Sequence, residues 1–493
     1  MSTDATQEHA RLIVTEPAAG TPAQLLRPTP HAIALPRPRW RDPSSADMFR
    51  STLATGASAA SLAVMIVTSL VVVSLAAARP GILIPTAIEN AVAHNGSYPA
   101  WLAGPTGGLT SWFSASAHAD RVFFTTAIAV MLVAYLVVVN SARRLRPSWI
   151  FGSILVLHVI FFLSPPLNLS DVFNYLNYGR MESVYRLNPY TTIPALEPHT
   201  DPTFLFSNWH GLLSPYGPLF TLFAIALVPL GVAGSLWAMK AVLMVASLAT
   251  VYLVYRCAQL LGRNPLAAAA IVGINPIVLV WGLGGDHNDF LMMFFLVLAF
   301  WLLLRARAMR VGRRARPTPP NQSLLRRGWA WLDGMPRPLA DGEPAAWMEV
   351  AAGIALVAAV AIKASSAVLI PIILCGTARR MRLAVGIVIG LAGAAAMTYI
   401  AFGLNLPNLG QQDRLVIPEG IPNLAGLALG FGGETTQMRN VLTVLLVAVV
   451  AGCCIWAWQS RRWLTQCGWV TFALIVTLSW TLPWYIVWLL PFA

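Results

Sequence analysis

The amino-acid sequence predicts an all-α, polytopic membrane protein, and three observations support this prediction. Of the 493 residues, 57% are hydrophobic and only 11% are charged, with a mean hydropathy of +0.65. Soluble domains carry roughly 25% charged residues. Apolar stretches long enough to cross a bilayer recur along the chain, and one strongly polar stretch, residues 167–216, is set among them.

About eleven membrane-spanning helices are expected, because each needs about 20 mostly apolar residues. Residues 218–233 are also apolar enough to span, but counting them reverses the orientation of every later Arg cluster. We therefore expect them to form an outer interfacial or re-entrant helix. The expected spans are 54–78, 122–141, 148–165, 235–256, 265–284, 289–305, 347–362, 364–377, 382–404, 438–459 and 466–482, followed by a final apolar piece at 483–493.

Arginine clusters set the expected orientation, because cytoplasmic loops carry an excess of Lys and Arg. Such clusters follow residues 142, 304 and 378, among others. Placing them inside makes the N-terminus cytoplasmic and puts the Asp171 loop, the 284–289 turn and the 405–437 loop outside. The net charge of +13 thus reflects membrane topology and does not indicate a nucleic-acid partner.

The chain divides into two expected regions. Residues 1–50 are rich in Pro, Ala and Thr, lack a signal-peptide pattern, and are predicted to be a disordered cytoplasmic tail. Residues 51–493 are the transmembrane domain. Within it we expect an outer loop with interfacial helices at 166–234 and a cytoplasmic loop at 306–346.

Asp171 begins the polar stretch directly after an apolar helix. A stretch this polar cannot lie in hydrocarbon, because each unpaired hydrogen-bonding group there costs several kcal/mol. We therefore expect it to lie on the membrane surface or to line a wet cavity. An acid at this position could be a general base toward an acceptor hydroxyl. It could equally be a helix N-cap, because Ser170 or Asp171 begins a helical sequence.

A second polar cluster, Gly284 to Asp289, lies between two apolar segments. Asp286, His287, Asn288 and Asp289 could bind hydroxyls or a phosphate, or could form no more than a turn with an Asx cap. They are too few for a zinc site, so no metal is predicted, although a weakly held divalent ion stays open.

Two lysines fall within or beside apolar segments. Lys363 interrupts the 347–377 stretch, and two short helices that turn there preserve the expected orientation. A lysine in such a place usually has a partner or a ligand. Lys363 could neutralise a lipid phosphate, or its side chain could snorkel to the interface. For Lys240 the sequence favours snorkelling.

Aromatic residues are concentrated on the expected outer side. Sugars stack on such rings, but interfacial Trp and Tyr belts are routine in membrane proteins. The sequence alone therefore leaves both interpretations open for Tyr175, Tyr178, Tyr185, Tyr190, Trp209, Tyr216, Trp480, Trp484, Tyr485 and Trp488.

Six motifs in order resemble the GT-C superfamily of polyprenyl-phosphate-sugar glycosyltransferases. They are SDVFNYLNYGR, RLNPY, SPYGPL, INP with GGDHND, IKASSAVLIP and TLPWYIVW. Within that superfamily the chain is most similar to the actinobacterial polyprenol-phosphomannose-dependent α-(1→6)-mannosyltransferases of lipomannan synthesis. The resemblance covers the chain from about residue 55 to its end.

This resemblance implies a role for each matching residue. Asp171 would be the catalytic base of an inverting reaction. Lys363 and Arg180 would contact the donor phosphate. The resemblance and the aromatic pattern together suggest that the sugar or the acceptor contacts His287, Asn288, Asp289, Tyr175, Tyr216, Trp484 and Tyr485.

The predicted function is therefore transfer of a hexose, by resemblance mannose, from a polyprenyl-phosphate donor to a glycan or glycolipid at the outer membrane face. The resemblance further implies α-(1→6) links, and no cofactor is predicted. A lipid-linked-glycan transporter or flippase is the alternative from another class, although the sequence shows no repeated halves. An enzyme using another polyprenyl-phosphate sugar, such as arabinofuranose, would require much the same residue types.

Overall fold

The computed structural model describes residues 45–78, 99–106, 117–167, 171–314 and 344–493. Its contacts divide the chain into Met1–Phe49 and Arg50–Ala493, and the second unit holds everything discussed below. The described residues form helices and connecting loops without any strand, which confirms the all-α prediction. Most of the expected 1–50 tail and most of the 306–346 loop lie outside the described residues.

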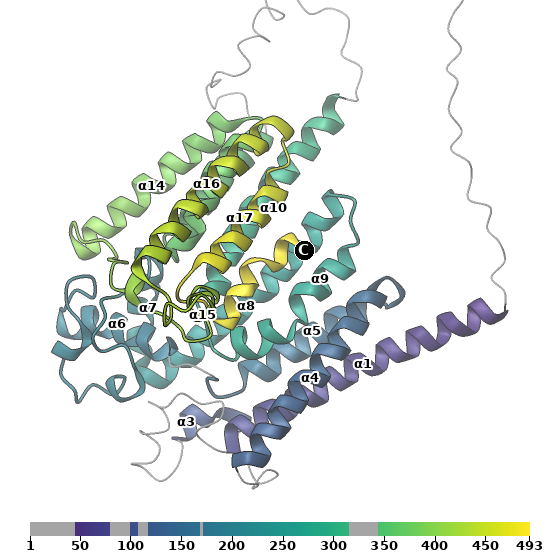
Figure 1. Ribbon diagram of the computed structural model, residues 1–493, viewed down its shortest axis with the longest axis horizontal. Coiled ribbons are helices and arrows are strands. Elements are labelled where there is room, and N and C mark those ends of the chain that lie inside the picture. The colour runs from purple at the N-terminus through teal and green to yellow at the C-terminus, as the bar shows by residue number, and fades with distance from the viewer. Residues whose placement is uncertain (1–44, 79–98, 107–116, 168–170, 315–343) are drawn as a thin grey trace, which may run out of the picture. The chain divides into compact units, whose positions relative to one another are not determined.

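The helices follow the apolar stretches of the sequence (Figure 1). The first begins before residue 50, and α10 continues well into the expected cytoplasmic loop. The α-helices are α1 Ser45–Ala78, α3 Ala100–Ala103, α4 Ala117–Ser141, α5 Pro147–Phe162, α6 Asp171–Tyr185, α7 Pro218–Leu227, α8 Gly231–Leu260, α9 Pro265–Gly273, α10 Asp289–Arg314, α12 Pro344–Val360, α13 Ile370–Gly376, α14 Arg380–Phe402, α15 Ile421–Ala428, α16 Thr436–Ser460 and α17 Trp463–Thr477.

Short helical turns complete the described structure. Most are 3₁₀ turns, and one, η6, is a π-helix that bends by 43° from α9. These turns are η2 Ala142–Arg144, η3 Pro194–Leu196, η4 Phe204–Phe206, η5 Val228–Leu230, η6 Ile277–Leu283, η8 Ala364–Leu369, η9 Gln412–Arg414, η10 Pro483–Trp488 and η11 Leu490–Phe492.

Six of the described helices are long and apolar enough to cross a membrane, or seven if the bent pair of α9 and η6 counts as one span. The structure supports a polytopic membrane protein but does not confirm a count of eleven. Several expected spans form helices of 15 to 17 residues, namely α5, α12 and α17. A helix of that length falls short of the roughly 20 residues that cross hydrocarbon without tilt.

The long apolar stretch at 347–377 breaks at Lys363, as the sequence predicted. α12 ends at Val360, Lys363 has an extended backbone, and η8 begins at Ala364. Helix α7 joins α8 through only one 3₁₀ turn, and together they form a 43-residue apolar segment. A straight helix of that length is about 65 Å long, well beyond a bilayer core of about 30 Å. The interfacial position of α7 stays a prediction.

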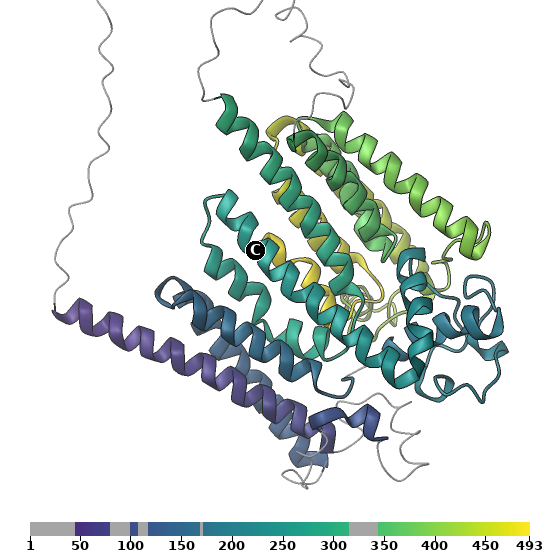
Figure 2. The ribbon, with the colours of Figure 1, turned by 180° about the vertical axis from the view of Figure 1, so that it is seen from behind.

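Helices α8, α10, α12 and α14 pack in this order against one another, with α14 at the edge of the molecule (Figures 1 and 2). Glycines allow α12 and α14 to approach closely. A Cβ at Gly353 would lie 2.4 Å from the Leu383 carbonyl oxygen, and one at Gly386 would lie 2.0 Å from that of Val350. Small residues at helix contacts are typical of membrane proteins, because close backbone packing replaces hydrophobic burial there.

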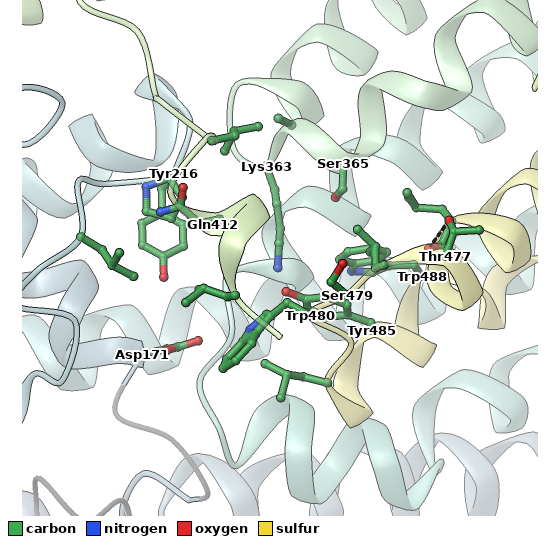
Figure 3. Close-up of a pocket in the computed structure, with 18 of the residues that line it drawn as sticks. Asp171, Tyr216, Lys363, Ser365, Gln412, Thr477, Ser479, Trp480, Tyr485 and Trp488 are labelled. Carbon is green, nitrogen blue, oxygen red and sulfur yellow. Dashed lines mark hydrogen bonds between the residues drawn. The ribbon is translucent and has the colours of Figure 1, made fainter. Parts of the chain in front are cut away.

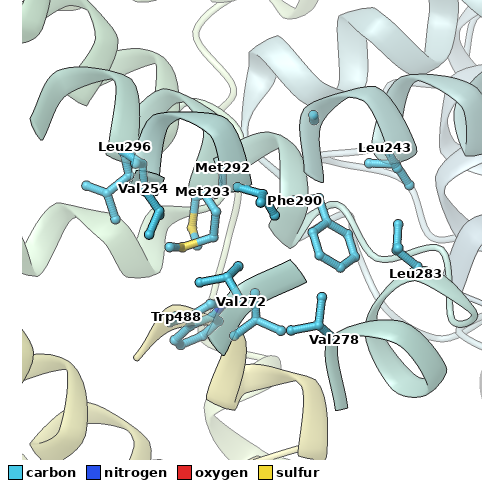
Figure 4. Close-up of a cluster of buried hydrophobic side chains, with 14 of the residues drawn as sticks. Leu243, Val254, Val272, Val278, Leu283, Phe290, Met292, Met293, Leu296 and Trp488 are labelled. Atoms are coloured by element: carbon cyan, nitrogen blue, oxygen red, sulfur yellow. The ribbon is translucent and has the colours of Figure 1, made fainter. Parts of the chain in front are cut away.

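Buried side chains from α8, α9, η6, α10 and η10 pack together in a hydrophobic cluster (Figure 4). The cluster contains Leu243, Val254, Val272, Val278, Leu283, Phe290, Met292, Met293, Leu296 and Trp488. The outer helices instead expose apolar side chains. In α16, for example, only 11% of the apolar stretch is buried. Such a surface suits lipid contact rather than water.

Candidate active site

One cavity of about 610 Å³ brings together segments that lie far apart in the sequence (Figure 3). Its wall includes α6, the loop before α7, the Lys363 turn, α16, α17 and η10. The predicted site residues that line it are Asp171, Tyr175, Tyr216, Lys363, Trp484 and Tyr485. The structure thus gathers six of the ten predicted residues around one space.

Asp171 is the first residue of α6, and its carboxylate is held by side chains from two other segments. Nε1 of Trp209 donates a hydrogen bond to Oδ1 at 3.2 Å. Nδ1 of His287 lies 3.5 Å from Oδ2, longer than an ordinary hydrogen bond. The Asp171 side chain stays 14% exposed, toward the cavity.

The surroundings of Asp171 favour its ionised form. Burial acts to raise its pKa, but His287, the Trp209 N–H and the charge of Lys363 together outweigh burial and hold the pKa below its usual value. The carboxylate is therefore ready to accept a proton at neutral pH. Whether Asp171 also caps α6 depends on residues 168–170, which lie outside the described ones.

The predicted Gly284–Asp289 turn lies behind the cavity wall. A Cβ at Gly285 would lie 2.5 Å from Nε2 of His287, so only glycine fits there. Asp286 has a φ of 55° and accepts hydrogen bonds from Nζ of Lys240 at 3.1 Å through both carboxylate oxygens. Burial raises the pKa of Asp286 to about 6, although the charge of Lys240 opposes it.

The expectation that Lys240 snorkels to the interface was wrong. Its side chain is 1% exposed and ends in the ion pair with Asp286. The pairing compensates the desolvation of both charges, so Lys240 has no need to reach water. This ion pair anchors the turn that carries His287 and Asp289.

His287 and Asp289 contact residues of the cavity wall from behind rather than lining the cavity. The His287 ring stacks on Trp484, with centroids 3.7 Å apart and planes at 13°. The side chain of Asn288 is fully buried and has no hydrogen-bond partner among the described residues. Its backbone N–H donates to the Tyr175 hydroxyl at 3.4 Å.

Lys363 projects its ammonium group into the cavity wall (Figure 3). Nζ donates to both carboxylate oxygens of Asp289 at 2.9 and 3.0 Å and lies over the Tyr485 and Trp488 rings at 4.7 and 5.2 Å. Burial acts to lower the pKa of Lys363, but the charge of Asp289 dominates and raises it. Lys363 is therefore a charged group at the cavity surface, with its side chain 19% exposed.

Arg180, the other predicted phosphate residue, does not line this cavity. Its Nε lies 3.0 and 2.9 Å from the two carboxylate oxygens of Asp201, which also accepts a hydrogen bond from the Tyr185 hydroxyl. Burial acts to raise the pKa of Asp201, but Arg180 and Thr203 outweigh it and lower the pKa. This cluster holds the Asp201 segment of the loop against α6.

The aromatic residues form the wall between Asp171 and the far end of the cavity. Tyr175 and Tyr216 meet edge to face, with centroids 4.8 Å apart, and Tyr485 stacks on Trp488 at 4.3 Å. Trp209 and Trp480 also meet edge to face, at 5.7 Å. These rings line the cavity together with the polar side chains of Asp171 and Lys363, an arrangement that suits sugar binding.

The sequence analysis missed several polar residues of the cavity, among them Gln412, Arg439 and Ser479. One signal could have identified Arg439, because it is an isolated arginine at the end of an expected span that faces outward. Across the described ranges, no group of three or more His, Cys, Asp or Glu side chains could hold a metal ion.

The fold and the cavity define a membrane enzyme with an ionised carboxylate, a charged lysine and aromatic rings around one space between apolar helices. A family model described as α-(1→6)-mannopyranosyltransferase, N-terminal domain, matches residues 81–379, more than half of the chain. The chain belongs to this family, and the protein is a glycosyltransferase.

Curated relatives agree with the family assignment. α-(1→6)-Mannopyranosyltransferase A of Mycobacterium tuberculosis is 23% identical over 76% of this chain and 70% of its own length. The Corynebacterium glutamicum protein of the same name is 30% identical over 29% of each chain. A probable α-(1→6)-mannopyranosyltransferase of Mycolicibacterium smegmatis is 24% identical over 75% of this chain and 69% of its own. No solved structure matches.

Proposed function

We propose that the protein transfers a mannosyl group from a polyprenyl-phosphate donor to a hydroxyl of a glycan or glycolipid, with inversion, forming α-(1→6) links. The description of its family and the names of its relatives support the sugar and the linkage. One structural observation carries the proposal: the Asp171 carboxylate and the Lys363 ammonium group line the same cavity.

In this mechanism Asp171 is the general base. It takes the proton of the acceptor hydroxyl while that oxygen attacks C1 of the donor sugar. The bond from C1 to the phosphate oxygen breaks, and the phosphate keeps the electron pair. Attack from the opposite face converts a β-linked mannosyl phosphate into an α-mannoside. Trp209 and His287 keep the carboxylate oriented and ionised for this step.

Lys363 stabilises the leaving group. The donor phosphodiester carries one negative charge, and the released polyprenyl phosphate is a monoester on which further charge develops. An ammonium group placed where this charge appears lowers the barrier, because it binds the transition state more tightly than the ground state. Asp289 and the two aromatic rings hold Lys363 in place for this role.

The two sides of the cavity suit the two halves of such a donor. Tyr175, Tyr216 and Trp484 offer rings for a sugar, and the apolar side includes Leu446, Leu474 and Leu478 for a polyprenyl chain. The Arg clusters support an N-terminus in the cytoplasm and an active site at the outer face.

A transfer assay with purified protein tests the proposal. Polyprenyl-phosphate-[¹⁴C]mannose and a short α-(1→6)-mannoside acceptor are incubated with wild type, Asp171→Asn and, as a matched control, Glu419→Gln at an exposed outer-loop acid. We expect Asp171→Asn to lower kcat about 10²- to 10⁴-fold, because general base catalysis is lost. The control should keep wild-type activity.

Two outcomes would contradict the proposal in different ways. Full activity in Asp171→Asn would reduce Asp171 to a helix cap, since Asn caps about as well as Asp. Folded wild type that leaves the mannosyl donor intact would reject this donor–acceptor pair. Polyprenyl-phosphate arabinofuranose would then be the next donor to assay.

A further inference from the structure

The cavity contains a second cation that this mechanism does not use. Arg439 lies near the start of α16 and lines the cavity together with Asn440 and Thr443. Thr443 is a helical neighbour of both other residues, because it lies four positions after Arg439 and three after Asn440. Arg439 therefore brings a cation to the cavity from α16, whereas Asp171 comes from α6.

Two neighbouring side chains fix the guanidinium group of Arg439. Its Nε donates to Oε1 of Glu434 at 3.2 Å and to Oγ of Ser479 at 3.2 Å. The Ser479 hydroxyl donates to the same Glu434 oxygen at 2.6 Å. The Glu434 side chain is fully buried, whereas that of Arg439 is 27% exposed. This small network orients Arg439 and leaves its charged group at the cavity surface.

Arg439 and Lys363 have similar surroundings. Each cation lines the cavity, and each has a buried acid behind it, Glu434 for Arg439 and Asp289 for Lys363. The acids offset the cost of placing a cation at the cavity wall. Arginine adds a planar fork that matches two oxygens of one phosphate, which a lysine cannot do.

We propose that Arg439 binds the phosphate of the lipid donor, oriented by Glu434 and Ser479, and shares the leaving-group charge with Lys363. This inference rests on the proposed function, because it takes the polyprenyl phosphate as given. It assigns the second phosphate contact to Arg439 of α16, while Arg180 is held by Asp201 in the outer loop.

Binding of polyprenyl phosphate and of the corresponding polyprenol to the full-length protein in detergent tests the assignment. Trp480, Trp484 and Trp488 line the cavity, so tryptophan fluorescence reports occupancy. Arg439→Gln should weaken binding of the phosphate lipid about 10- to 100-fold, as expected for a lost charge-assisted hydrogen bond. Its affinity for the polyprenol should not change. Arg439→Lys should lose less, because it keeps the charge.

The control is Arg414→Gln, which removes an exposed arginine of the 405–437 loop that does not line the cavity and should leave both affinities unchanged. If Arg439→Gln does not fold, Ser479→Ala replaces it and should weaken binding of the phosphate lipid a few-fold, because the guanidinium loses one of its supports.

Three results would overturn the assignment. Arg439→Gln could bind polyprenyl phosphate as tightly as wild type, or it could lose affinity for the polyprenol equally, which would report damage to the cavity. In the replacement experiment, Ser479→Ala that binds polyprenyl phosphate as tightly as wild type would also overturn the assignment. Wild type that binds the two lipids equally would instead reject the proposed donor, so the two failures are distinguishable.

Discussion

Two lysines form ion pairs with aspartates of the 284–289 turn, and the two pairs differ in their exposure. Lys240 of α8 pairs with Asp286 at 3.1 Å, and Lys363 pairs with Asp289 at 2.9 Å, three residues further along. The first pair is enclosed, with side chains 1% and 3% exposed. In the second, Asp289 is 2% exposed but Lys363 is 19% exposed and lies over two aromatic rings.

This difference in exposure separates a pair with a structural role from a pair that can take part in the reaction. A buried ion pair that lines no cavity has no access to a substrate, so its role is to stabilise the fold. A pair with one partner at a cavity wall can bind a charged substrate. The same two residue types therefore have different roles: the Lys240–Asp286 pair anchors the 284–289 turn, and the Lys363–Asp289 pair places a charge at the cavity.

The largest effect on stability is expected from breaking the enclosed pair. Lys240→Met leaves the Asp286 carboxylate buried without a partner and should lower the free energy of unfolding by about 3–5 kcal/mol. Thermal or denaturant unfolding in detergent measures this. Adding Asp286→Asn should recover most of the loss. A single variant as stable as wild type would contradict the structural role of the pair.

Lys363→Gln should act mainly on the reaction. Loss of one group that stabilises developing charge typically costs about 10²- to 10³-fold in kcat. Steady-state kinetics with the polyprenyl-phosphate donor checks this, and the loss of stability should be smaller than for Lys240→Met because Lys363 is partly exposed. An unchanged kcat with full folding would remove Lys363 from the site.

His287→Gln tests how the turn serves Asp171. His287 helps to lower the pKa of Asp171, so its removal should raise that pKa. Asp171 acts as a base only when it is deprotonated, above its pKa. The acid limb of kcat/KM against pH should therefore move to higher pH. An unmoved limb would show that His287 does not act through Asp171.

Glu197 extends the comparison of the two lysine–aspartate pairs, because its carboxyl group is buried but forms no ion pair with a lysine in the described part of the chain. Both its side-chain oxygens lack a hydrogen-bond partner among the described residues, and burial raises its pKa to about 7. The folded state then holds this proton more tightly than the unfolded state, so stability falls as pH rises from about 4.5 to 7.

Glu197→Gln should remove that pH dependence. It should stabilise the protein at pH 8 by on the order of 1 kcal/mol, because no charged form has to be buried. Unfolding curves of wild type and variant at pH 5 and pH 8 provide the measurement. The same stability difference at both pH values would mean that Glu197 does not titrate in this range.

Much of the fold could be predicted because the signals are local. Apolar stretches gave the helical segments, and Lys363 marked a helix break that the structure contains. The number of spans could not be predicted as well. Length and apolarity are weak criteria for α5, α12 and α17, which are short and pack against other helices.

The site was predictable residue by residue but not as an arrangement. Asp171, Lys363 and the aromatic residues were found from chemistry that looks out of place in an apolar chain. The ion pairs of Lys240 and Arg180 were not, because their partners lie 46 and 21 residues away in the sequence. Asp289 is 74 residues from Lys363 and 199 from Trp488, yet it bonds to both.

The sequence by itself determined the class of protein, the helical segments and the polar residues available for chemistry, because composition and hydropathy act over a few turns of chain. The tertiary structure decided which of these residues share a cavity and which cation is enclosed, paired or exposed. Those properties arise from burial and from contacts between remote helices. The energy of a charge depends on its surroundings in space and not on its neighbours in the chain.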